Sequence, residues 1–156
     1  MKYLRSSLFA LLVVALGLSG CTTGPKPGGI TVTALTLQLA GTSPTELRAP
    51  LILRFANENI IALGYSASSH KLFVNGTYVG KAVNDQPIGL PPMNEATREV
   101  YVQLENATLL HQLVAGAASR EVNYRLETVL FQTAGDDKLE IKVRSEGRLE
   151  LRTAGN

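Results

Sequence analysis

The chain has 156 residues, with 15 Lys and Arg residues against 13 Asp and Glu residues, a formal net charge of +2 at pH 7, and a single cysteine. Because the sequence has no run of basic residues, it argues against a nucleic-acid partner. One cysteine excludes an internal disulfide and a cysteine-based metal site. The length and the 45% hydrophobic content are typical of one domain with a substantial core.

The first 20 residues have the layout of a secretory signal peptide. Lys2 and Arg5 give a basic start, and residues 8–18 are almost uninterruptedly apolar before two small residues. This apolar run is shorter than the roughly 20 residues that a membrane-spanning helix needs. We therefore expect residues 1–20 to be removed. The mature chain would then carry 13 basic and 13 acidic residues, and no net charge.

The cysteine follows this apolar run directly, in the segment Leu18-Ser19-Gly20-Cys21. The segment resembles the lipobox of bacterial lipoproteins. The resemblance implies a diacylglyceryl group on the Cys21 sulfur, cleavage just before it, and acylation (palmitate) of the new amino terminus. Two or three acyl chains make attachment to a membrane stable. The alternative, a packed structural cysteine, is disfavoured by the Gly, Thr and Pro residues around it.

Residue 22 bears on the membrane to which the lipoprotein is sorted. In the usual sorting pattern, an Asp after the lipidated cysteine retains the protein in the inner membrane, whereas this chain has Thr22. The resemblance therefore implies the outer membrane, with the domain facing the periplasm. Residues 21–29 form the lipidated cysteine and a flexible tether, because 22–29 are rich in Gly and Pro and contain no apolar side chain. The tether spans at most about 26 Å.

Residues 30–156 form the expected folded domain, and alternation of apolar and polar residues dominates it. In residues 46–55, Leu51, Leu53 and Phe55 share one face while Arg48 and Arg54 point the other way, as in a half-buried strand. Solvated arginines are a simpler interpretation than a ligand-binding pair. The inward positions of the other strands are Leu35, Leu37, Leu39, Val100, Val102, Leu104, Val122, Tyr124, Leu126, Leu130, Leu139, Ile141 and Val143.

Two irregularities are expected within and between these strands. Ile30 and Val32 have the opposite parity to the inward residues that follow them, which predicts a β-bulge near Ala34. Asn75-Gly76 separates two apolar runs and predicts a β-hairpin with a type I′ turn. In this hairpin Val74 pairs with Thr77, and the next opposed residues are Phe73 with Tyr78 and Leu72 with Val79.

A second turn is expected at Glu146-Gly147, between the last two strands. The helical candidate is the segment 106–118, in which Leu109, Leu110, Leu113 and Val114 form an apolar stripe. About seven short strands and one short helix predict an all-β fold. The expected architecture is an antiparallel β-sandwich of immunoglobulin or fibronectin-III type, and the alternative is an eight-stranded barrel.

The stretch LRFANENIIALGYSASSHKLFVNGTYVGKAV, residues 53–83, resembles the LEA-2 or WHy (water stress and hypersensitive response) domain family, and a weaker likeness extends over residues 30–152. In that family a strand ends in an Asn-Pro-Asn-like turn and an Asn-Gly hairpin follows; here Glu58 replaces the proline. The resemblance implies a sandwich fold and a stress-related role, with no catalytic set. Turn chemistry explains Asn57, Asn59, Asn75 and Gly76 better than a binding role does.

No candidate catalytic or metal-binding set is complete. His70 and His111 have no acidic or histidine partner at metal-ligand spacing. Asp136-Asp137 offers too few oxygen ligands for calcium and is expected to form a solvated turn. A nucleophile elbow needs Gly-x-Ser-x-Gly, which is absent around the serines near His70, namely Ser66, Ser68 and Ser69. We expect no catalytic residue, no cofactor and no metal.

These features together predict a membrane-anchored, non-enzymatic lipoprotein that faces the periplasm and protects in desiccation or envelope stress. Its partners would be the membrane, through the lipid on Cys21, and an envelope protein or lipid, for example at an exposed sheet edge. The alternative is a module that binds or transfers a lipid or another apolar ligand in the cell envelope. An enzyme is the least supported of the three classes.

Overall fold

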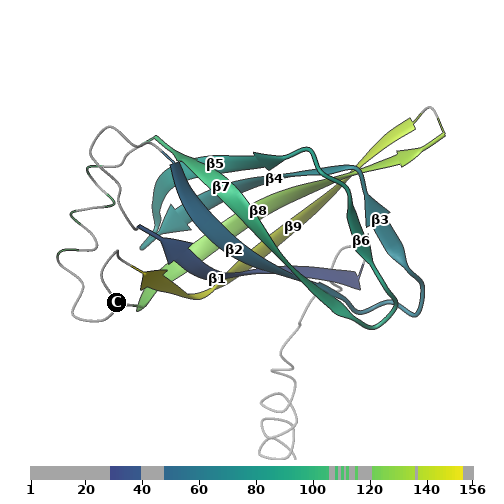
Figure 1. The fold of residues 1–156 in the computed structure, drawn as a ribbon, viewed down its shortest axis with the longest axis horizontal. Helices are drawn as coiled ribbons and strands as arrows, with labels where there is room; N and C mark the ends of the chain where they lie inside the picture. Colours follow the sequence, from purple (N-terminus) through teal and green to yellow (C-terminus); the bar gives the residue numbers. More distant parts are fainter. Residues whose placement is uncertain are drawn as a thin grey trace, which may run out of the picture.

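The computed structural model describes residues 29–39, 48–105, 121–135 and 137–152, together with Thr108, Leu110, Gln112 and Ala115. In these residues seven strands form a closed barrel in the order β1-β2-β7-β5-β4-β8-β9, and β3 pairs with β6 at one end (Figure 1). The strands are β1 (Ile30–Gln38), β2 (Arg48–Asn57), β3 (Leu63–Tyr65), β4 (Ala67–Val74), β5 (Thr77–Asn84), β6 (Ile88–Leu90), β7 (Glu95–Leu104), β8 (Glu121–Ala134) and β9 (Asp137–Arg152). The all-β prediction is confirmed.

The barrel closes through two short ladders. β5 pairs with β7 only over Gly80 to Ala82, and β1 runs parallel to β9 only over Thr36 to Gln38. At the first seam, a Cβ atom on Gly80 would collide with the backbone carbonyl oxygen of Gln103, so only glycine permits this approach. The seven strands of the barrel are therefore one closed sheet rather than the two facing sheets of the expected sandwich. The barrel alternative was right about closure, with seven strands instead of eight.

The core follows the predicted alternation. Ala49, Leu51, Leu53 and Phe55 of β2 are fully buried. The predicted inward residues of β7 and β8 are buried as well. Burying a large aliphatic or aromatic side chain contributes about 1.5–3 kcal/mol, so this alternation provides most of the drive for folding.

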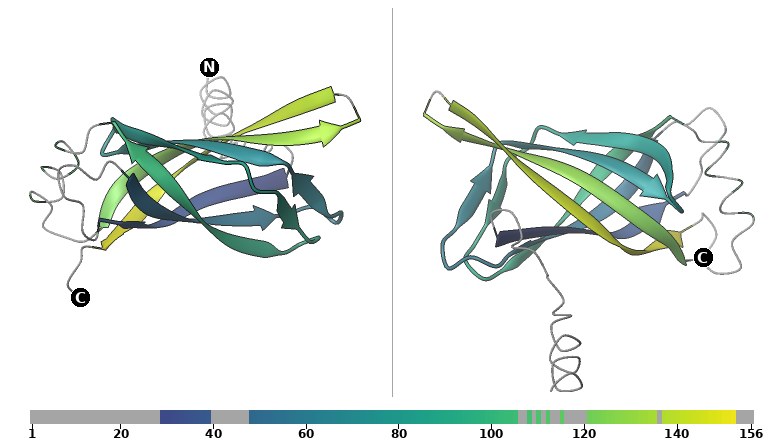
Figure 2. Two further views of the ribbon diagram at one scale, coloured as in Figure 1. Left: turned by 45° about the horizontal axis from the view of Figure 1, so that its top comes forward. Right: turned by 180° about the vertical axis from the view of Figure 1, so that it is seen from behind.

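Two predicted inward residues were wrong. The pairing of β1 with β2 shifts between Ala34 and Thr36, which confirms the bulge and turns Leu35 partly outward. Leu139 is 49% exposed, since the β8–β9 hairpin extends beyond the body of the barrel (Figures 1 and 2). The side-chain pattern alone does not show where a strand extends beyond the body of the barrel.

The predicted hairpin lies between β4 and β5. Asn75 and Gly76 have φ angles of 48° and 82°, the left-handed conformation that a type I′ turn requires. Val74 pairs with Thr77 and Phe73 with Tyr78, as predicted. A bulge then shifts the register, so that Leu72 pairs with Gly80 and not with Val79. Both residues of the bulged strand are buried at this point.

The turn predicted at Glu146-Gly147 is wrong. β9 continues through both residues, and the chain reverses at Gly135, whose φ is 65°. Gly147 lies opposite Tyr124, whose ring occupies the space in front of it. In the segment 106–118, Thr108, Leu110, Gln112 and Ala115 are helical and Leu110 is buried. The rest of that predicted helix, including His111, lies outside the described residues.

Candidate functional site

His70 lies in the interior of the barrel. It projects from β4, and its side chain is 1% exposed. Its Nδ1 lies 2.9 Å from the Thr128 hydroxyl of β8, and its Nε2 lies 2.9 Å from the Ser68 hydroxyl. The Phe55 ring meets the imidazole edge on, at 6.1 Å between centroids. Burial lowers the pKa of His70 to about 4, so the imidazole is neutral at pH 7.

This cluster of Ser68, His70 and Thr128 has no catalytic arrangement. All three side chains are buried, and Ser68 and Thr128 both bond to His70, whereas a nucleophile must reach its substrate and its base needs an orienting group. Among the described residues, no group of three or more His, Cys, Asp and Glu side chains could hold a metal ion. The cluster satisfies buried polar groups, as folding requires.

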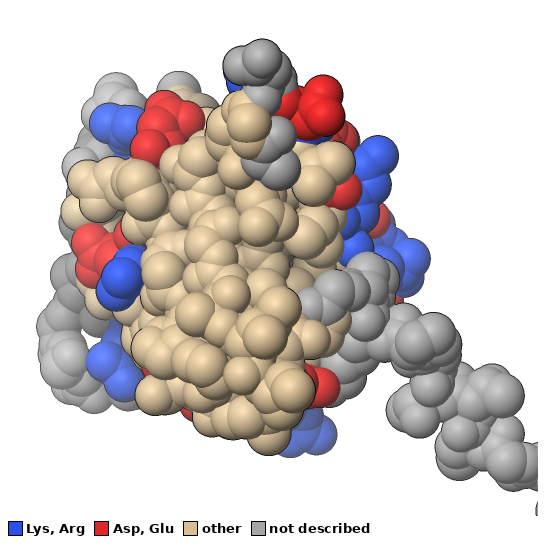
Figure 3. All heavy atoms as spheres, turned by 90° about the vertical axis from the view of Figure 1, so that its right-hand side faces the viewer, with Lys and Arg blue, Asp and Glu red and all other residues tan. Residues whose placement is uncertain are grey.

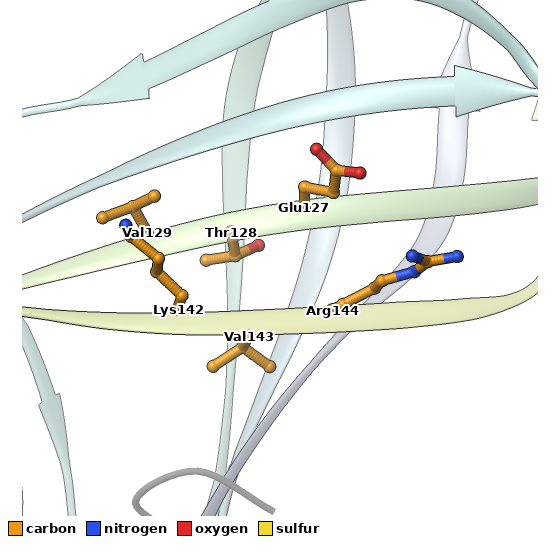
Figure 4. A pocket seen from close by; sticks show the side chains of 6 residues that line it. All are labelled: Glu127, Thr128, Val129, Lys142, Val143 and Arg144. Carbon is orange, nitrogen blue, oxygen red and sulfur yellow. The ribbon is translucent and has the colours of Figure 1, made fainter.

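A pocket of about 250 Å³ lies over the paired strands β8 and β9. Figure 4 shows Thr128 and Val143 lining it beside the outward side chains. The outward residues are Glu127 and Val129 of β8 and Lys142 and Arg144 of β9. Sites for drug-sized ligands usually measure about 300–1,000 Å³, so this pocket is small.

Asn57 is the centre of a hydrogen-bond network at the end of β2. Its side chain is 2% exposed, and its Nδ2 donates to the carbonyl oxygens of Ile61 at 2.8 Å and of Pro91 at 2.9 Å. Its Oδ1 accepts from the backbone N–H of Asn59 at 2.9 Å. The Asn59 side chain in turn donates to the carbonyl oxygen of Gly29. Two loops and the start of β1 are thus held together by two asparagine side chains.

The β4–β5 turn, which contains Asn75 and Gly76, lies at the opposite end of the barrel (Figure 1). The Asn75 backbone N–H donates to the carbonyl of Asn123 at 2.8 Å, and its Oδ1 accepts from the Asn123 N–H at 3.2 Å. These bonds fix the β4–β5 turn to β8. The positions of all four predicted turn residues are therefore explained by backbone geometry and local bonds.

Three large apolar side chains project from the loops that flank β3 and β6. Ile60 is 86% exposed, Ile61 62% and Met93 68%; we call these three residues the apolar end. Met93 N–H donates to the carbonyl of Asn59 at 2.9 Å, which joins the two loops. Sequence reasoning missed this feature. Its signal was present, because residues 59–70 and 86–94 contain no Lys, Arg, Asp or Glu.

The remaining predicted site residues are either solvated or undescribed. Arg48 lies 6.0 Å from the centroid of the Tyr101 ring, and Arg54 lies 3.8 Å from Glu95, so the two arginines do not form a shared anion site. Asp137 is exposed at the start of β9. Cys21 and the tether up to residue 28 lie outside the described residues. No helix in the described part of the chain is long and apolar enough to cross a membrane.

Comparison with known proteins places these features in a family. A family model described as late embryogenesis abundant protein (LEA_2) matches residues 53–155. A solution structure of a protein from Arabidopsis thaliana is similar, at a TM-score of 0.50 and 15% identity over 85% of each chain. A crystal structure of a protein from Archaeoglobus fulgidus has a TM-score of 0.45 and 16% identity, covering 78% of this chain and 94% of that one.

A further solution structure is described as that of a late embryogenesis abundant (LEA) protein. It has a TM-score of 0.45 and 14% identity, and the match covers 97% of this chain and 87% of that one. No curated protein sequence matches the chain. At 15% identity, the similarity to the Arabidopsis thaliana structure with a TM-score of 0.50 bears on the fold alone.

Proposed function

Because the chain belongs to the late embryogenesis abundant (LEA_2) family, we propose that it is a non-enzymatic protective module, held on a membrane by lipid on Cys21, that acts when the cell envelope loses water. The family match over residues 53–155 is the observation that carries the proposal. The interior agrees with it, since the buried Ser68 and Thr128 side chains bond to His70 instead of facing a substrate.

The sequence before the barrel supports the membrane attachment. A basic start, an apolar run over residues 8–18 and the lipobox-like Leu18-Ser19-Gly20-Cys21 occur in the order that a lipoprotein needs. Thr22 in place of Asp favours the outer membrane. With a tether no longer than about 26 Å, the barrel would stay close to that surface and face the periplasm.

The charge pattern of β8 and β9 suits a protein that must stay folded during drying. Outward side chains form ion pairs along both strands. Exposed ion pairs contribute little in water, but the attraction between opposite charges grows as the surrounding dielectric constant falls. Drying would thus strengthen contacts that are weak in solution. The pairs are Arg125–Glu127, Lys142–Glu140, Arg144–Glu146, Arg148–Glu121 and Arg152–Glu150.

Survival after drying and rewetting tests this role. A deletion strain would carry the wild-type gene, the Cys21→Ser variant or an empty vector, with matched expression of the two proteins. We expect the wild type to restore survival and Cys21→Ser to restore much less of it. Equal survival of the deletion strain and the wild type would contradict the protective role. Full rescue by Cys21→Ser would contradict the need for the lipid.

The pocket over β8 and β9 gives little support to a carrier of lipids or other apolar ligands. At about 250 Å³, it lies below the range that encloses most of a drug-sized ligand. Charged side chains, Glu127, Lys142 and Arg144, also contribute to its lining. Native mass spectrometry of the chain would show the protein with its own anchor and no further ligand if the protective role is correct.

A further inference from the structure

We propose that the apolar end lies against the lipid surface to which Cys21 is attached, so that Ile60, Ile61 and Met93 insert among the lipid headgroups and the barrel stands on its β3–β6 end. The inference rests on the proposed attachment through Cys21 and adds to it a defined orientation and a second, non-covalent contact with the membrane.

The first observation is that the three side chains are held outward by the fold. The buried Asn57 side chain donates hydrogen bonds to both loops, at the carbonyl oxygens of Ile61 and Pro91. Met93 has a φ of 49°, a left-handed conformation that is unfavourable for a residue with a side chain and persists only where its surroundings impose it. Loops fixed in this way present their apolar side chains to the outside permanently.

The second observation concerns charge. Figure 3 looks onto the end of the barrel where β3 and β6 lie, and its middle is free of Lys, Arg, Asp and Glu, which appear around the margin. The charged residues that border the two uncharged stretches, 59–70 and 86–94, are the acidic Glu58, Asp85 and Glu95 and the basic Lys71. The margin carries both signs of charge, and an uncharged centre with such a margin suits zwitterionic lipids and gives no particular attraction to anionic ones.

The third observation is the position of the tether. Gly29, the last residue of the tether and the first described one, lies at this same end, because its carbonyl accepts bonds from the Glu58 N–H at 2.8 Å and from Asn59 Nδ2 at 3.1 Å. Only residues 22–28 separate it from Cys21, a span of at most roughly 26 Å. The anchor therefore brings the apolar end, and not the Asn75–Gly76 end, to the lipid surface.

The chemistry favours a lipid over a protein partner. Exposed aliphatic side chains on otherwise uncharged loops gain free energy on entering the boundary between headgroups and acyl chains. Because the lipid anchor keeps the barrel next to the membrane, the effective concentration of the membrane surface is high, and even a small apolar contact with it is populated. Three inserted side chains would suffice to orient a barrel that the lipid anchor already retains.

The experiment uses the full lipidated chain, purified in detergent and reconstituted into vesicles of phosphatidylethanolamine and phosphatidylcholine. An environment-sensitive fluorophore is attached to the introduced thiol of Ile60→Cys. Thr77→Cys is the matched control, because Thr77 is exposed in the hairpin at the opposite end. We expect the label at position 60 to shift to the blue and to lose most of its emission when the vesicles contain nitroxide lipids. The label at position 77 should keep both its wavelength and its intensity.

A second reporter tests the contribution of the isoleucines. A label on Met93→Cys should be quenched by nitroxide lipids in the otherwise unchanged chain and should lose most of that quenching when Ile60→Asp and Ile61→Asp are added. Equal quenching at positions 60 and 77 in a chain that stays on the vesicles would overturn the orientation and leave the attachment intact. A label at position 60 that is shielded from aqueous iodide but unaffected by nitroxide lipids would point to a protein cover and would also overturn it.

Failure of the attachment itself is recognised separately. In the chain without introduced cysteines, Cys21 should not react with a maleimide, because its sulfur is acylated. A reactive Cys21, together with loss of the chain from the vesicles, would remove the proposed attachment and with it the orientation.

Discussion

The two ends of the barrel are closed in the same way but expose different side chains. Each end is closed by turns that asparagine side chains hold, Asn57 and Asn59 at one end and Asn75 at the other. At the Asn75 end the turn exposes Asn75, Gly76 and Thr77, which water solvates well. At the apolar end the turns expose Ile60, Ile61 and Met93.

At the apolar end, folding requires the Asn57 network but does not require the exposed apolar side chains. The Asn57 network closes the β3–β6 end whether the outward residues are apolar or polar, because it bonds to backbone groups. Large apolar side chains at the tips of such loops gain nothing for the isolated barrel in water. These side chains lie at the end that also holds the tether, and folding does not explain them. They are explained if this end contacts a second surface.

The largest expected effect comes from removing the network at the apolar end. Asn57→Ala leaves several buried backbone groups without partners and should lower the free energy of unfolding by about 3 kcal/mol. At the other end, Asn75→Gly loses only the exposed bond from the Asn123 N–H and should change it by no more than about 1 kcal/mol, because glycine adopts positive φ without strain. Urea unfolding of both variants measures the contrast. Similar losses at the two ends would contradict the central position of Asn57.

The barrel interior between the two ends should respond to pH through His70. Its pKa is about 4 in the folded protein against 6.5 for an unperturbed histidine, so the unfolded chain binds the proton first as the pH falls. The stabilising contribution is complete above about pH 6.5 and is lost as the pH drops toward 4. From pH 7 to pH 5 the free energy of unfolding should decrease by about 2 kcal/mol.

His70→Gln is the control for this loss, since an amide retains hydrogen-bonding groups and does not titrate. Denaturant unfolding at pH 7 and pH 5 should show a much smaller decrease for the variant than for the wild type. Equal decreases would mean that other groups cause the acid sensitivity.

Tyr65, in β3 beside the apolar end, provides a smaller test. Its ring is buried, and its hydroxyl makes no hydrogen bond to any described residue. Burial also raises the pKa of Tyr65. Because an unpaired buried hydroxyl is costly, Tyr65→Phe should leave the protein as stable or raise its free energy of unfolding by up to about 1 kcal/mol. A clear loss in thermal unfolding would reveal a partner for the hydroxyl.

The smallest effect on the free energy of unfolding is expected from the exposed isoleucines of the apolar end, which distinguish it from the Asn75 end. The double variant Ile60→Ser and Ile61→Ser should change the free energy of unfolding by no more than about 0.5 kcal/mol, because both side chains are exposed. Urea unfolding of the variant beside the wild type measures this. A loss of several kcal/mol would show that the isoleucines serve the fold, and the reason to seek a second surface would disappear.

Features set by neighbouring residues could be predicted from the sequence, and features set by distant ones could not. Alternation located the buried faces of β2, β7 and β8, and Asn75-Gly76 located the hairpin. Gly147 was misjudged because its role depends on Tyr124, a cross-strand neighbour, and not on the adjacent Glu146. Closure depended on the approach of Gly80 to Gln103, which no local pattern reports.

The site features divide in the same way. No local pattern could identify the hydrogen-bond partner of His70, because Thr128 lies 58 residues away and projects from another strand. The apolar end combines two loops whose contact depends on the fold, through Met93 and Asn59. The two uncharged stretches at 59–70 and 86–94 could have suggested it, although only the pairing of β3 with β6 brings them together.

The intact mass of the chain extracted from the cell envelope tests most directly whether the barrel is held on a membrane through Cys21. The account predicts a mass equal to residues 21–156 plus a diacylglyceryl group and an amino-terminal acyl chain, and the absence of that species for Cys21→Ser. A chain that keeps residues 1–20, or a mature chain with an unmodified Cys21, would contradict it.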